Sequence, residues 1–111
     1  VPRCSGGAVT QAQATQQAKA AFPASAMDRF RTIASDTLGL VKADDQAAAA
    51  DRATDLETAW DDDQATLQPT DCQAWTYLDE QIDPVLSAVR ASSPDQTTEE
   101  AALTKLLDTL G

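Results

Sequence analysis

Carboxylates are the main candidates for chemistry in this chain, because histidine is absent and aspartate is abundant. The 111 residues include 18 acidic and 8 basic side chains and no histidine. Without an imidazole base, neither a serine nor Cys4 or Cys72 has the usual partner that activates a nucleophile. A carboxylate-based hydrolase would need a cleft that holds two carboxyl groups at a set separation, which nothing in the sequence marks. We therefore expect no enzyme and keep such a hydrolase as an alternative.

Three consecutive aspartates, Asp61, Asp62 and Asp63, are weak candidates for a calcium site. Calcium takes six to eight oxygen ligands, and an EF-hand loop needs glycine at its sixth position and glutamate at its twelfth. A loop starting at Asp61 has Thr66 and Cys72 there. Neighbouring helical residues also point in different directions. Divalent-cation binding or buffering is a second alternative, and we expect no cofactor.

A second acidic feature is a row of aspartates on one side of a predicted helix. At 100° per residue, Asp44, Asp51, Asp55 and Asp62 superimpose almost opposite an apolar face. The row would extend over about 27 Å of helix. A solvated polar face is the ordinary interpretation of such a row. The functional hypothesis is that this acidic stripe binds a basic protein or another cationic ligand.

Trp60 and Trp75 are candidates for an aromatic ligand wall, with Tyr77 at its rim. Both tryptophans, however, share an apolar face with leucines at helical spacing. We therefore interpret them as core residues that pack near one corner of a helical hairpin.

Apolar residues return every three or four positions through most of the chain, and no segment alternates with a period of two. This pattern predicts an all-α fold, an antiparallel four- or five-helix bundle forming a single domain over residues 1–111. The predicted elements are an extended arm at 1–7 and helices at 8–22, 25–41, 45–67, 71–92 and 96–110.

Capping residues and prolines set these boundaries. Ser25 is a candidate cap for the second helix, Asp44 or Asp45 for the third, and Thr70 or Asp71 for the fourth. Pro84 lies inside an apolar stripe that continues across it, so we expect a kink there rather than a new helix.

The two cysteines, Cys4 and Cys72, suit one disulfide in a small exported domain. The bridge would close a loop of nearly seventy residues, which is worth about 4 kcal/mol in the chain-entropy model. Two free thiols in a cytosolic protein are the alternative. The chain does not begin with methionine, which suggests a processed N-terminus from which a signal peptide has been removed. We expect a secreted or periplasmic location.

The charge balance excludes some partners. A net charge of −10 repels phosphate backbones, so we expect no nucleic-acid binding. No stretch approaches the roughly 20 apolar residues that span a bilayer.

Several landmarks keep a fixed order in the second half of the chain: Asp55 to Asp62, Leu67-Gln68-Pro69-x-Asp71, Trp75, Asp79, Ile82-Asp83, Leu86 and Arg90-Ala91-Ser92-x-Pro94-Asp95. This pattern resembles a group of small exported bacterial helical proteins of uncharacterised function. Pro84 and Cys72 depart from it. The resemblance implies export and an all-helical fold, and it supplies no site residues. Together these observations favour a non-catalytic extracytoplasmic interaction module of unknown specificity and oligomeric state, which uses an acidic helix surface.

Overall fold

The computed structural model describes residues 9–111, and its elements are all helices. The predicted arm at 1–7 and Cys4 lie outside the described residues. The all-α prediction is confirmed. The helices are α1 (Gln11–Ala21), α2 (Ala24–Lys42), α3 (Gln46–Thr70), α4 (Cys72–Val89) and α5 (Gln96–Leu110).

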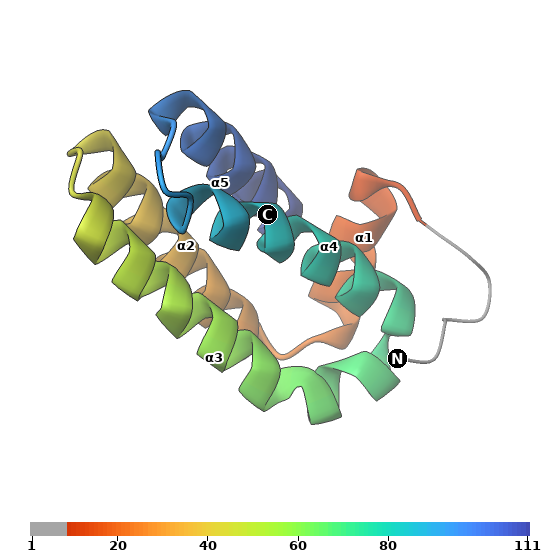
Figure 1. Ribbon diagram of the computed structural model, residues 1–111. Coiled ribbons are helices and arrows are strands. Elements are labelled where there is room, and N and C mark those ends of the chain that lie inside the picture. Colours follow the sequence, from red (N-terminus) through yellow and green to blue (C-terminus); the bar gives the residue numbers. More distant parts are fainter. Residues whose placement is uncertain (1–8) are drawn as a thin grey trace.

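Helices α2 to α5 form an antiparallel four-helix bundle (Figure 1). Each packs on the next in the chain, and α5 closes the bundle by packing on α2. The short connections between successive helices favour this up-and-down order. Helix α1 lies outside the ring and packs on both α4 and α5. No described helix is both long enough and apolar enough to cross a membrane.

The core is aliphatic around one aromatic cluster. Trp60 of α3 stacks on Trp75 of α4, with ring centroids 5.6 Å apart, and meets Phe30 of α2 edge-on at 5.2 Å. The two tryptophans are only 2% and 5% exposed. Their interpretation as core residues is therefore confirmed, and the cluster joins three helices of the bundle.

Aspartate caps start three of the helices. The carboxylates of Asp45, Asp71 and Asp95 accept bonds from the first-turn amides of α3, α4 and α5. Such caps satisfy amides that have no partner within the helix. The expectation for Ser25 is wrong: α2 begins at Ala24, and Pro23 occupies the cap position without a side-chain bond. Proline suits a helix start because its missing amide costs nothing there.

The remaining boundaries differ from the sequence-based ones by a few residues. Helix α1 begins at Gln11 rather than at residue 8, because Thr10 and Gln13 form a capping box. Helix α3 runs through Pro69 to Thr70, beyond the predicted end at 67. Helix α4 is one helix across Pro84, so no new helix starts there, and it ends at Val89 rather than at 92.

Candidate functional site

The structure divides the predicted acidic stripe. Asp51, Asp55 and Asp62 are exposed on α3. Asp44 does not belong to that helix: it lies in the preceding turn with a φ of 59°. Because Asp45 takes the cap position, Asp44 is outside the helical spiral, and the predicted superposition of four aspartates is reduced to three. Aspartate tolerates the left-handed region better than most residues.

Part of the stripe is neutralised within the protein. Arg52 of α3 bonds to Asp55 at 3.1 Å and to Asp36 of α2 at 3.0 Å. The hydrogen bonds that Arg52 donates to these two carboxylates raise the pKa of Arg52. Asp55 is therefore engaged locally, whereas Asp51 and Asp62 form no ion pair among the described residues. The stripe alone offers few free charges to a partner.

A second group of carboxylates lies where α3 faces α4. We call it the acidic seam: Asp61 of α3 with Asp79, Glu80 and Asp83 of α4. Asp79 is half-buried, and burial is the main cause that raises its pKa above the ordinary aspartate value. Repulsion from the other three members raises that pKa further. The seam therefore has no internal cation that offsets its charge.

The core holds the centre of the seam in place. Trp60 donates its indole N–H to Asp79 at 3.0 Å, and this bond partly opposes the rise in the pKa of Asp79. Asp79 lies one helical turn after Trp75, on which Trp60 stacks. The stacked pair therefore fixes both the donor and the helix that carries the acceptor.

The seam belongs to a long segment of one charge sign. Between Arg52 and Arg90 the chain contains no lysine or arginine. Three arginines outside this interval pair with its carboxylates: Arg52 with Asp55 at 3.1 Å, Arg29 with Asp63 at 3.7 Å, and Arg90 with Glu57 at 2.9 Å. The same interval contains nine acidic residues: Asp55, Glu57, Asp61, Asp62, Asp63, Asp71, Asp79, Glu80 and Asp83.

Sequence reasoning missed the seam because it considered one helix at a time. Neither helical periodicity nor a motif shows that Asp61 faces Asp79, since their separation depends on how α3 packs on α4. Two signals were nonetheless visible: the interval without basic residues, and the spacing of four between Asp79 and Asp83.

The three consecutive aspartates do not converge. Asp61 and Asp62 are exposed, whereas Asp63 is half-buried and faces Arg29. Within residues 9–111, no three histidine, cysteine, aspartate or glutamate side chains are placed to hold a metal ion together. Among the described residues, the carboxylates of the α3–α4 surface extend along both helices and do not converge on one point.

Comparisons with known proteins find no match to a family model, to a curated protein or to a solved structure.

Proposed function

We propose that this protein is a non-catalytic extracytoplasmic interaction module and that the α3–α4 hairpin binds a basic protein or another cationic ligand. The observation that carries the proposal is the interval from residue 53 to 89, with nine acidic and no basic residues. Arginines pair with Asp55, Glu57 and Asp63. The other exposed carboxylates have no ion pair among the described residues: Asp61, Asp62, Glu80 and Asp83.

The chemistry of the surface indicates what kind of partner fits. Carboxylates that extend along two helices match several cations carried on one extended or helical segment. They do not match one point charge. Electrostatic attraction of this kind accelerates association and weakens as salt is added. A lysine- or arginine-rich segment of a protein therefore suits the hairpin better than a single metal ion does.

The binding experiment compares two variants of equal net charge. The seam variant Asp61→Asn/Glu80→Gln/Asp83→Asn removes three charges from the hairpin while leaving Asp79 in place. The matched control Asp44→Asn/Glu100→Gln/Asp108→Asn removes three charges elsewhere. The probe is a lysine-rich synthetic peptide, titrated calorimetrically at low and at physiological salt, with a glutamine-for-lysine peptide as the uncharged reference.

We expect the seam variant to bind the peptide roughly tenfold more weakly, since exposed pairs contribute about 0.2–1 kcal/mol each. The control variant should keep the affinity of the unmodified protein within about twofold. Equal losses in the two variants would mean that only net charge matters, and the hairpin would not be a specific surface.

The proposed location depends on the predicted disulfide between Cys4 and Cys72. Cys72 is half-buried and is the first residue of α4, next to the cap Asp71. A bridge there would tether the N-terminal segment to the hairpin. Intact mass spectrometry before and after reduction tests this, with a gain of about two hydrogen masses expected from a bridge. An unchanged mass would remove the main support for an oxidising location.

A further inference from the structure

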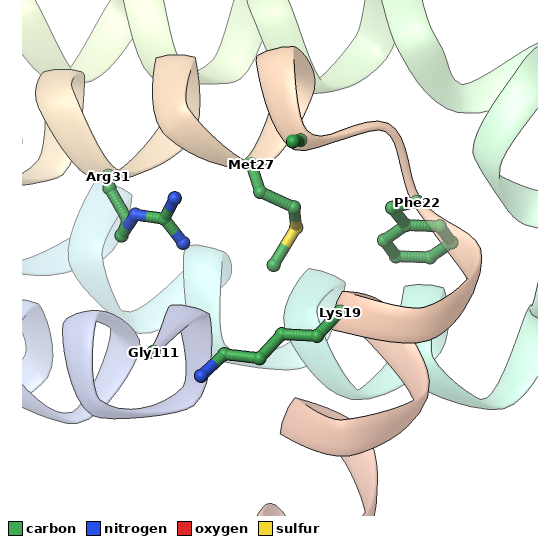
Figure 2. A pocket seen from close by; sticks show the side chains of 6 residues that line it. Lys19, Phe22, Met27, Arg31 and Gly111 are labelled. Atoms are coloured by element: carbon green, nitrogen blue, oxygen red, sulfur yellow. The ribbon is translucent and has the colours of Figure 1, made fainter.

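A hollow of about 410 Å³ differs from the acidic hairpin in its chemistry, because basic and apolar residues line it. It forms where the connection between α1 and α2 meets the C-terminal end of α5. Figure 2 shows Lys19 extending from α1, and Met27 and Arg31 from α2, toward the same space. The hollow is lined by Lys19, Phe22, Ala24, Met27, Arg31 and Gly111.

Two of the protein's eight basic residues line this one hollow, although the net charge is −10. Lys19 is exposed and forms no ion pair or hydrogen bond among residues 9–111. Its ammonium group lies over Gly111, where an added Cβ would come within 2.8 Å of the nitrogen. The Lys19 ammonium therefore lies close to the end of α5 and is not paired with an acidic side chain of the described residues.

Arg31 provides a second cation with unused donors. One of its nitrogen atoms donates to the carbonyl of Leu110 at 3.0 Å, and another pairs with Asp28. A guanidinium has five N–H groups, so these contacts leave others for an additional acceptor. The bond to Leu110 also fixes Arg31 against the end of α5, which pre-organises the group.

The floor of the hollow is apolar. Phe22 and Met27 are 4% and 3% exposed, and Ala24 is beside them at the start of α2. A volume of about 410 Å³ falls within the range that small organic ligands occupy. Cations at the rim with carbon at the floor suit a ligand that has one anionic end and one apolar end.

We propose that this hollow binds a small organic carboxylate with an apolar tail, its carboxylate between Lys19 and Arg31 and its tail against Phe22 and Met27. The site is separate from the acidic hairpin and would take a ligand of opposite charge. Its existence does not depend on the function proposed for that hairpin.

The test titrates octanoate into the isotopically labelled protein and follows the backbone amide signals. Octylammonium, which reverses the charge, and acetate, which lacks the tail, are measured at the same ionic strength. We expect octanoate alone to give saturable shifts, concentrated in residues 19–31 and at Gly111. Equal effects from octylammonium or acetate, or no saturable shift with octanoate, would overturn the proposal.

The variant Lys19→Gln provides the second measurement, because an exposed side chain can be replaced without disturbing the core. We expect it to weaken octanoate binding about fivefold. The matched control is Lys42→Gln, which makes the same charge change at the exposed far end of α2. Equal affinities in the two variants would show that Lys19 does not contact the carboxylate and would contradict the assigned site.

Discussion

Glu99 is the most unusual residue in the interior. Its side chain is fully buried in the first turn of α5, and neither carboxylate oxygen accepts a hydrogen bond within the described part of the chain. The helix dipole favours an acidic group at this end, by about 0.3–1 kcal/mol. Removing a carboxylate from water without a partner costs more than that. Glu99 therefore lowers the stability of the bundle.

We predict that Glu99→Met increases the free energy of unfolding by about 1–3 kcal/mol, because an unbranched apolar side chain fills the same space without leaving buried oxygens unpaired. Urea unfolding measures the difference. Glu100→Met is the control, because Glu100 is only half-buried and its replacement should change stability by less than about 0.5 kcal/mol. Destabilisation by Glu99→Met would mean that the carboxylate has a favourable partner.

The pH dependence of stability depends on Asp79. Burial and the other carboxylates of the seam raise its pKa in the folded state above 3.8, the ordinary value for an aspartate. A raised folded-state pKa means that the folded protein holds this proton more tightly. The resulting stability is complete below pH 3.8 and is lost as the pH rises through the folded-state pKa of Asp79. Glu57 contributes to the pH dependence in the opposite direction, because the hydrogen bond that Arg90 donates lowers the pKa of Glu57 in the folded state.

We predict that the variant Asp79→Asn no longer loses stability from this position as the pH rises above about 4. Asparagine keeps an oxygen that accepts the indole N–H of Trp60, while its neutral group ends the repulsion from Asp83 one turn away. At pH 7 the variant should be about 0.5 kcal/mol more stable. Urea unfolding from pH 3.5 to 7, with tryptophan fluorescence as the signal, measures both effects. Parallel pH profiles for the two proteins would contradict the assignment to Asp79.

At the scale of helices, α1 is attached differently from the others. Within it only Ala14 and Ala18 are fully buried, so it contributes little apolar surface. Polar contacts with α5 add to its attachment: Gln11 donates to the Thr109 hydroxyl at 2.9 Å, and Thr15 donates to the Thr109 carbonyl at 2.7 Å. We therefore expect α1 to open before the bundle does.

We predict that Thr109→Val selectively loosens α1. Valine preserves the shape of this buried residue but removes the acceptor for Gln11, at a cost of about 1 kcal/mol. Hydrogen exchange should become faster in the amides of α1 and remain unchanged in α3 and α4. Thr104→Val, at an exposed position of α5, is the control. Uniformly faster exchange throughout the protein would show that α1 unfolds only with the whole bundle.

At the scale of the whole molecule, charge segregation decides how ions affect stability. The hairpin carries dispersed carboxylates, and the described residues provide no three-ligand cluster for a metal. Divalent cations should therefore act by screening repulsion rather than by occupying one site.

We predict that calcium and magnesium, compared at equal ionic strength with a chelator control, raise the midpoint of thermal unfolding by the same small amount, about 2 °C. Differential scanning calorimetry measures this midpoint. A distinctly larger shift with calcium alone would indicate a selective site and would favour the divalent-cation alternative over the interaction module.

The sequence alone was sufficient to predict an all-α bundle of four or five helices and most of its core. Apolar residues at helical spacing, such as Trp60 with Leu56 and Trp75 with Leu78, are local patterns that depend only on the geometry of one helix. Aspartate caps are also local, since a cap bonds to amides two or three residues away. The prediction that Ser25 caps α2 was wrong. Serine and proline both suit a helix start, and which of them takes the cap position depends on how the chain leaves α1.

The candidate sites required the tertiary structure, because their residues come from different helices. Asp61 comes near Asp79 only through the packing of α3 on α4, and Lys19 and Arg31 line one hollow only through the placement of α1 and α2 beside α5. The burial of Glu99 was likewise decided by the closure of the bundle, since its position in a first helical turn is equally compatible with solvent. Helical periodicity is a property of consecutive residues, whereas charge proximity and cavities depend on the relative placement of whole helices. The sequence therefore determined the helices and their apolar faces, and packing determined which charges became neighbours.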